Sequence, residues 1–118
     1  MRHAKRGRKF GLKRGKRKAF LRNLAGNFVR QERVQTTEAR AKELRPLIEK
    51  LVTHAKKQDV AALRLLLERL PKSAAFKLYH DIAPRYSSRP GGYVRIVKQV
   101  RRRKHDAAQL ATIEFVKD

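Results

Sequence analysis

Acid–base, metal and nucleophilic chemistry each need a few side chains at defined spacing, and this sequence offers few such sets. The ten Asp and Glu residues are dispersed, so a pair of carboxylates holding a divalent metal is not predicted. The four histidines show no ligand spacing, and His80 and Asp81, as neighbours on a helix, would face different ways. The chain contains no cysteine, which excludes thiolate zinc sites, disulfides and cysteine nucleophiles. Because no P-loop or serine nucleophile elbow is present either, we expect no catalytic residue, no metal ligand, no cofactor and no small-molecule substrate.

Positive charge is the feature that does indicate a binding chemistry. The 118 residues include 32 Lys and Arg but only 10 Asp and Glu, a formal net charge of +22. Residues 1–31 carry 12 basic and no acidic residues, residues 32–83 carry 11 and 7, and residues 84–118 carry 9 and 3. The surplus therefore lies at the two ends of the chain, which predicts contact surfaces there for a polyanionic partner.

The first 17 residues cannot bury a core of their own. They include glycines at positions 7, 11 and 15, and their only large apolar side chains after Met1 are Phe10 and Leu12. We predict an extended basic arm over residues 1–17, which becomes ordered when phosphates neutralise it. A merely solubilising tail is the alternative, but such tails seldom combine this density of cations with a complete absence of acids.

Apolar periodicity predicts the helices and the strand that follow the arm. Residues 18–30 show helical spacing of apolar side chains. The β-branched segment Arg33-Val-Gln-Thr-Thr37 predicts a short strand that ends in an N-cap for the next helix. That helix carries an apolar stripe over residues 41–55, and Pro46 is expected to kink it.

Two shorter helices are predicted after this one. Asp59 is expected to cap a leucine-rich helix that Pro71 stops, and Ser73 to cap another that Pro84 stops. Heptads are not sustained over this region, so we interpret it as one side of a globular core rather than as a zipper.

The C-terminal part predicts a β-hairpin. Val94, Ile96 and Val100 alternate with Arg95 and Gln99 in the first strand, and residues 109–116 form the second strand pattern. The connection over residues 101–107 is very basic, so the tip is expected to contact phosphates. The order α-β-α-α-α-β-β predicts an α+β fold: a small mixed sheet of about three strands covered by helices. We expect one globular domain over residues 18–118, with its basic hairpin near residues 93–116.

Nucleic acid is the polyanion that these residues favour, and RNA is favoured over DNA. A long basic arm, a basic hairpin tip and an Arg/Tyr loop suit irregular folded RNA, whereas no helix presents an evident reading face for a major groove. Tyr86 and Tyr93 lie between Arg85, Arg89 and Arg95. Their rings fit stacking on a base and closure of the core edge about equally, so both interpretations stay open.

Three other classes of protein share part of this charge pattern. A nucleoid-type DNA-binding protein has the same charge physics and would prefer duplex DNA. A nuclease or RNA-modifying enzyme would turn over RNA when magnesium is added, which we do not expect. A cationic membrane-active protein needs a sustained amphipathic basic helix, and the densest charge here lies on a glycine-punctuated segment. The longest apolar run covers only residues 60–63, so we predict no membrane span or secretion signal, and a cytoplasmic protein.

Several short motifs occur together in fixed order over nearly the whole chain: Met1-Arg-His3 with Gly7-Arg-Lys9, Arg22-Asn23, Thr36-Thr37 before Arg40-Ala-Lys-Glu-Leu-Arg45, Ala83-Pro-Arg-Tyr86, and Arg89-Pro-Gly-Gly-Tyr93 with Arg95. In this combination the chain resembles the bacterial large-subunit ribosomal protein family numbered seventeen. The resemblance implies a non-catalytic structural component of the large subunit that binds and stabilises large-subunit ribosomal RNA near the rim of the peptide exit tunnel. It also implies neighbouring ribosomal proteins as partners.

The candidate RNA-binding residues combine the basic segments with the positions that the family motifs match. Thr36 and Thr37 are expected to set a strand-to-helix turn, and Gly91 and Gly92 to permit close backbone approach or positive φ angles. The full set is Arg2, His3, Lys5, Arg6, Arg8, Lys9, Lys13, Arg14, Lys16, Arg17, Lys18, Arg22, Asn23, Thr36, Thr37, Arg40, Lys42, Arg85, Tyr86, Arg89, Gly91, Gly92, Tyr93, Arg95, Arg101, Arg102, Arg103 and Lys104.

Overall fold

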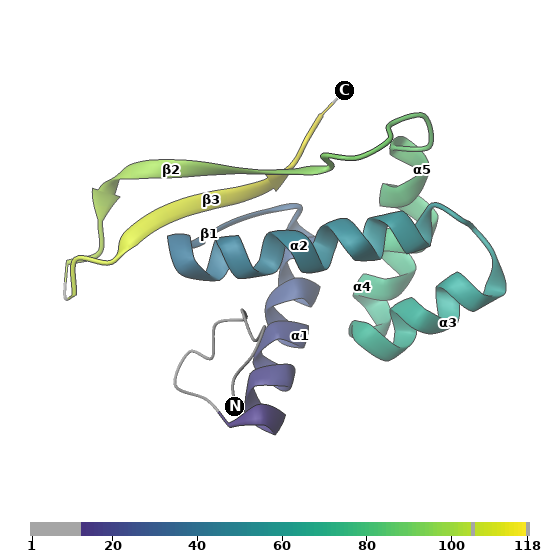
Figure 1. Ribbon diagram of the computed structural model, residues 1–118, viewed down its shortest axis with the longest axis horizontal. Helices are drawn as coiled ribbons and strands as arrows, with labels where there is room; N and C mark the ends of the chain where they lie inside the picture. The colour runs from purple at the N-terminus through teal and green to yellow at the C-terminus, as the bar shows by residue number, and fades with distance from the viewer. Residues whose placement is uncertain (1–12, 105, 118) are drawn as a thin grey trace, which may run out of the picture.

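The computed structural model describes residues 13–104 and 106–117, and its elements follow the predicted order (Figure 1). They are α1 (Arg14–Gln31), β1 (Arg33–Thr37), α2 (Glu38–Ala55), α3 (Val60–Arg69), α4 (Lys72–Lys77), the π-helical turn η1 (Leu78–Ile82), α5 (Ala83–Arg85), β2 (Val94–Arg102) and β3 (Gln109–Phe115). The predicted α+β class is confirmed.

The three strands form one sheet in the order β1-β3-β2. Both pairs are antiparallel, where a mixed sheet was predicted: Arg33 pairs with Glu114 on one side of β3, and Arg95 pairs with Glu114 on the other. The short connection between β2 and β3 permits only antiparallel pairing, and β1 runs opposite to β3 along its other edge.

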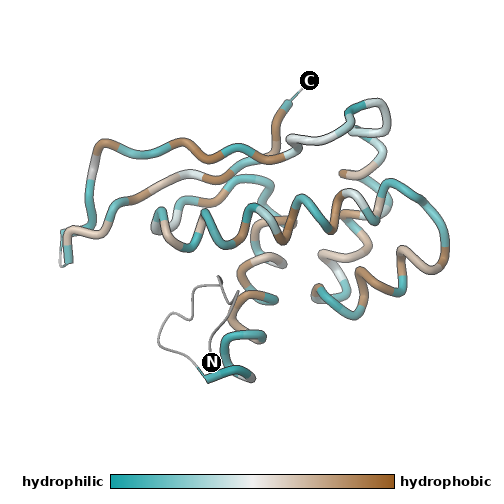
Figure 2. Tube along the Cα trace, viewed as in Figure 1, coloured by the Kyte–Doolittle hydropathy of each residue, from teal (hydrophilic) through white to brown (hydrophobic). Residues whose placement is uncertain are grey.

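The core surrounds α2, which lies between the sheet and the other helices, and the described helices lie on one side of the sheet (Figure 1). Leu44, Ile48 and Val52 of α2 are fully buried, as is Ile113 of β3. In Figure 2 apolar positions recur along the helices and strands, whereas the first turns of α1 and the end of the hairpin are hydrophilic. No described helix covers the opposite face of the sheet, where Arg33 and Gln35 are exposed.

The β2 strand departs from the alternation that predicted it. Val94 is buried as expected, but Val100 is fully exposed. The register shifts between Lys98, which pairs with Ala111, and Arg102, which pairs with Gln109, so β2 contains two extra residues there. Such a bulge breaks the period of two, and Val100 therefore turns to solvent instead of the core.

Helix α1 begins four residues before the predicted start at residue 18. Lys and Arg are good helix formers, and a single glycine at position 15 costs too little to stop the helix. Residues 14–17 therefore belong to α1 and not to an extended arm. The rest of the predicted arm lies outside the described residues, apart from Lys13, the residue before the helix.

The segment from Lys72 to Arg85 is one continuous run of helical turns instead of a helix capped by Ser73 and stopped by Pro84. The N-cap position is Pro71, and the Ser73 hydroxyl accepts a hydrogen bond from Arg30 Nε at 3.0 Å. Before Pro84 the chain widens into η1, where the Ala83 N–H donates to the Leu78 carbonyl. The wider turn accommodates the proline ring, which a regular α-helix would bring against the carbonyl of residue 80.

Candidate nucleic-acid interface

The first turns of α1 present the densest cluster of exposed cations among the described residues. Lys13, Arg14, Lys16 and Lys18 are exposed and Arg17 is half-buried. This end of α1 projects away from the rest of the protein (Figure 1). Cations at a helix N-terminus oppose the helix dipole, so an anion bound at this end would stabilise α1. The more N-terminal candidates, Arg2, His3, Lys5, Arg6, Arg8 and Lys9, lie outside the described residues.

Arginines further along α1 also hold the fold together. Arg22 Nη2 donates to the carbonyl of Leu70 at 3.2 Å, and Arg30 donates to Ser73. Both contacts tie α1 to the α3–α4 region. The predicted RNA-binding residue Arg22 is exposed but partly committed to an internal hydrogen bond, and its neighbour Asn23 is also exposed.

The strand-to-helix turn is built as the sequence predicted. Thr37 is the N-cap of α2, and its side chain accepts from the Arg40 N–H at 3.3 Å. The Arg40 guanidinium lies 5.1 Å from the centre of the Phe20 ring, so this cation packs on α1. Lys42 forms an ion pair with Glu38 at 2.8 Å. Thr36, in β1, is half-buried.

Tyr86 and Tyr93 are each 2% exposed, which favours the core interpretation over base stacking. Their ring centres are 5.4 Å apart, and the Tyr86 ring also packs on Phe115. The Tyr86 hydroxyl donates to the carbonyl of Val116 at 2.5 Å. The aromatic residues of this loop thus anchor it to β3 from the inside.

The glycines and arginines of the same loop lie nearer the surface. Gly92 has a φ of +67°, the left-handed conformation that the sequence allowed for, and Gly91 is half-buried. Arg89 Nε donates to the Gly91 carbonyl at 3.1 Å, which stabilises the turn. Arg95, at the start of β2, is exposed and forms an ion pair with Glu114 at 2.9 Å.

Arg85 lies in an ion-pair network at the junction of α1, η1 and α5. It pairs with Glu32, and with Asp81 at 3.0 Å, while Lys77 pairs with Glu32 at 3.1 Å. The hydrogen bond from Arg85 is the main cause that lowers the pKa of Glu32, and the same contact raises the pKa of Arg85. Arg85 thus links the end of α1 to α5 and presents only part of its charge to solvent.

At the hairpin tip, Arg103 forms an ion pair with Asp106. The hydrogen bonds that Asp106 accepts from the Arg103 side chain and from the Ala108 N–H lower the pKa of Asp106 to about 2. Arg102 donates to the Ala107 carbonyl at 3.1 Å, and Lys104 is exposed. For Arg101 only the backbone, in β2, is described. The tip is therefore basic as predicted, but its arginines also close the turn.

The carboxylates of the described residues are mostly occupied within the fold. An ion pair or a backbone N–H engages each of Glu32, Glu38, Glu49, Asp59, Asp81, Asp106 and Glu114. These carboxylates stabilise contacts between helices, strands and loops of the protein itself. The cations that they do not neutralise remain on the surface.

Sequence reasoning missed one group of exposed cations, on the outer face of α2. Arg45 and Lys50 of α2, and Lys57 just after its end, are exposed and lie outside the buried stripe of Leu44, Ile48 and Leu51. They occupy positions that the apolar period leaves to solvent, and that signal could have identified them.

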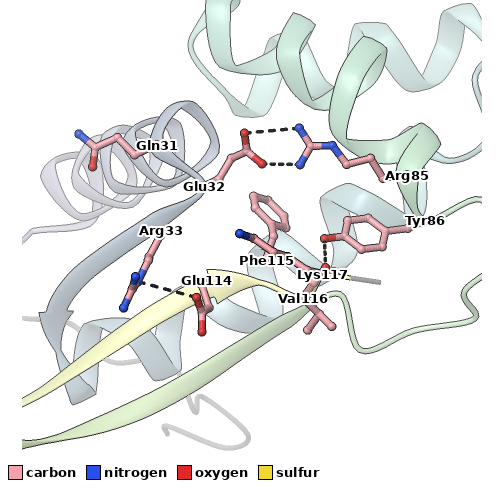
Figure 3. Close-up of a pocket in the computed structure, with 9 residues that line it drawn as sticks. All are labelled: Gln31, Glu32, Arg33, Arg85, Tyr86, Glu114, Phe115, Val116 and Lys117. Atoms are coloured by element: carbon pink, nitrogen blue, oxygen red, sulfur yellow. Dashed lines mark hydrogen bonds and ion pairs between the residues drawn. The ribbon is translucent and has the colours of Figure 1, made fainter.

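The described residues supply no evident catalytic centre. A pocket of about 670 Å³ is lined by residues at the end of α1, in α5 and at the end of β3, but no His, Ser or Thr lines it (Figure 3). Its carboxylates, Glu32 and Glu114, point to Arg85 and Arg33. Within residues 13–104 and 106–117, no three His, Cys, Asp or Glu side chains gather in a way that could hold a metal ion. The helices found in that part of the chain are also too short or too polar to cross a membrane.

Known proteins resemble this chain over most of its length. A family model described as ribosomal protein L17 matches residues 20–116. The large ribosomal subunit protein bL17 of Desulforamulus reducens is 50% identical over 110 residues, which cover 92% of this chain and 97% of that protein. The large ribosomal subunit protein bL17 of Syntrophus aciditrophicus is 45% identical over 119 residues, covering 100% of this chain and 94% of that protein.

Proposed function

Because this chain belongs to the ribosomal protein L17 family, a family of structural and non-enzymatic ribosomal components, we propose that it binds and stabilises large-subunit ribosomal RNA directly. It is a component of the large subunit of the cytoplasmic ribosome. Its proposed position, near the rim of the peptide exit tunnel with other ribosomal proteins as neighbours, rests on the family resemblance alone.

The observation that carries direct RNA binding is the separation of charges. The chain has a formal net charge of +22, and the acids of the described residues are mostly engaged inside the fold. Exposed cations remain on several surfaces, among them the start of α1, the outer face of α2 and the hairpin tip. A polyanion that meets several such surfaces gains affinity by releasing its counterions.

The globular part is proposed to dock on the RNA surface while the basic N-terminal segment neutralises phosphates that would otherwise repel one another. In this way separate RNA segments would be held together during assembly. Phosphate contacts are assigned to the basic candidate residues. Gly91 and Gly92 would allow close approach of the backbone to the RNA.

Deleting residues 2–12 tests the role assigned to the N-terminal segment and leaves α1 intact. These residues contain five Lys and Arg. If all five contact phosphates, the slope of log affinity against log salt should become shallower by up to about 3.5. Filter binding of the full-length and shortened chains to transcribed large-subunit ribosomal RNA would measure this, with circular dichroism as the control for helix content.

Equal affinity and equal salt slope for the two chains would contradict the assignment of the segment to RNA binding. Duplex DNA of the same charge serves as competitor. If it displaced the RNA at equal nucleotide concentration, the binding would be a general affinity for polyanions and the RNA-specific proposal would be wrong.

A further inference from the structure

The carboxylate of Glu49, on α2, binds the backbone of a neighbouring loop. Glu49 lies on the side of α2 that faces the start of β2, between the exposed Arg45 and Lys50 on its own helix. Its Oε2 atom accepts a hydrogen bond from the Tyr93 N–H at 3.2 Å, and its Oε1 atom accepts one from the Val94 N–H at 3.0 Å. Both oxygens are thus used to hold the backbone where the loop becomes a strand.

Lys56, the residue that follows the last residue of α2, holds the other end of the same segment. Lys56 Nζ donates to the Arg89 carbonyl and to the Tyr93 hydroxyl, the latter at 2.8 Å. It also lies 4.9 Å from the centre of the Tyr93 ring. Lys56 is half-buried, so its contacts lie within the fold.

The two side chains act from a rigid platform. They are separated by seven residues, which is about 10 Å along a helix, and therefore lie on the same side of α2. Ile48 and Val52, which lie beside them on α2, are fully buried and fix the helix against the core. The segment between the two contacts includes Gly92, whose positive φ would be strained for other residue types. Glu49 and Lys56 therefore hold this segment at both ends.

We infer that Glu49 and Lys56 are positioning residues that fix segment 89–94 on α2, so that the loop over residues 87–92 and Arg95 meet RNA in one preset conformation. This inference rests on the proposed function, which places Arg89, Gly91, Gly92 and Arg95 in the interface. A loop that is already ordered does not lose conformational entropy on binding, and affinity rises accordingly.

Glu49→Gln distinguishes a positioning role from a purely electrostatic one because the two predict opposite changes in RNA affinity. The substitution removes a negative charge, so a protein that attracts RNA only through its net charge should bind more tightly. It also replaces an acceptor oxygen by an NH₂ group, so one of the two backbone N–H groups loses its acceptor. If the competent loop conformation falls to about one tenth of the population, the dissociation constant rises about tenfold.

The matched control is Glu68→Gln, which makes the same charge change at an exposed position on α3. We expect this variant to bind transcribed large-subunit ribosomal RNA as tightly as the unaltered chain or slightly more so, and Glu49→Gln to bind more weakly. In the unbound protein, the amide hydrogens of Tyr93 and Val94 should exchange faster in Glu49→Gln while those of Ile48 and Val52 remain protected.

Glu49→Asp gives a second variant with no change of charge and a shorter reach, in case Glu49→Gln fails to fold. We expect it also to weaken binding and to speed exchange at Tyr93 and Val94. If the folded Glu49 variants bind RNA as the Glu68 control does, the positioning role is overturned and the proposed function stands. If the unaltered chain itself does not bind the RNA, the proposed function falls first and this inference falls with it.

Discussion

Single carboxylates contribute to this protein mainly as holders of local structure. Glu32 joins Arg85 and Lys77, Glu114 lies between Arg33 and Arg95, and Asp59 caps α3 through the Ala62 N–H at 2.7 Å. Each contact satisfies a cation or an N–H at the end of an element. How much an acidic residue stabilises this basic protein therefore depends on its partners. We expect the loss of unfolding free energy on its replacement to differ from site to site.

Glu32→Gln should lower stability at neutral pH and have little effect in acid. The pKa of Glu32 is lowered in the folded protein from the ordinary value of 4.5, chiefly by the hydrogen bond from Arg85. A lowered folded pKa means that the stabilisation is fully present above pH 4.5 and is lost as the pH falls through the folded pKa. Because the pair is partly exposed and screened by solvent, we expect a loss of at most about 1 kcal/mol at pH 7.

Urea unfolding of both proteins between pH 3 and pH 7 would measure this difference. The gap in unfolding free energy between the two proteins should narrow as the pH falls below 4.5. A gap that stayed constant over the whole range would show that the charge of Glu32 is not what stabilises this junction.

At the scale of elements, the packing of α1 on the α3–α4 connection depends on one glycine. A Cβ atom at Gly26 would lie 2.8 Å from Pro71 Cγ and 2.9 Å from Pro71 Cδ. The ring of Pro71 is rigid, so α1 would have to move. The glycine that weakens helix propensity in the middle of α1 is thus required by the tertiary contact.

Gly26→Ala should therefore destabilise the protein even though alanine is the better helix former. The overpacking cost exceeds the gain in propensity, and we expect a net loss of about 1–2 kcal/mol. Gly15→Ala, on the same helix with nothing within 4 Å of the added Cβ, should instead stabilise by up to about 1 kcal/mol. Thermal unfolding of the two variants would show the opposite signs, and equal shifts would refute the packing argument.

Most elements could be predicted from the sequence because each one has a one-sided apolar period or a clear cap. The Thr37 and Asp59 caps and the hairpin follow from local residues alone. The differences arise where contacts distant in sequence decide. Ser73 receives a hydrogen bond from Arg30 instead of capping a helix, and the register shift in β2 exposes Val100.

The same distinction applies to the candidate site. Basic segments can be read from composition, but not the internal partners of particular cations, such as Arg85 with Glu32, 53 residues away. Burial of Tyr86 and Tyr93 depends on Phe115 and Lys56, which only the folded chain brings to them. For the same reason Glu49 could not be recognised as a holder of the loop.

At the scale of the whole molecule, the structure is a modest core that carries charge at its extremities. The helices pack on one face of the sheet, while α1 and the hairpin extend away from the core in different directions (Figure 1). The outer ends of these two elements are hydrophilic, and they come from opposite ends of the sequence (Figure 2). A protein of this shape is suited to contact several separate segments of RNA at once, as the proposed function requires.

The most direct test of this account is sedimentation of a cell lysate at low and at moderate salt, with and without ribonuclease, following the protein across the gradient. We predict that it migrates with the large subunit, remains there at moderate salt, and is released when the RNA is digested. Migration with DNA, or retention on the intact protein assembly after the RNA has been digested, would contradict direct binding to large-subunit ribosomal RNA.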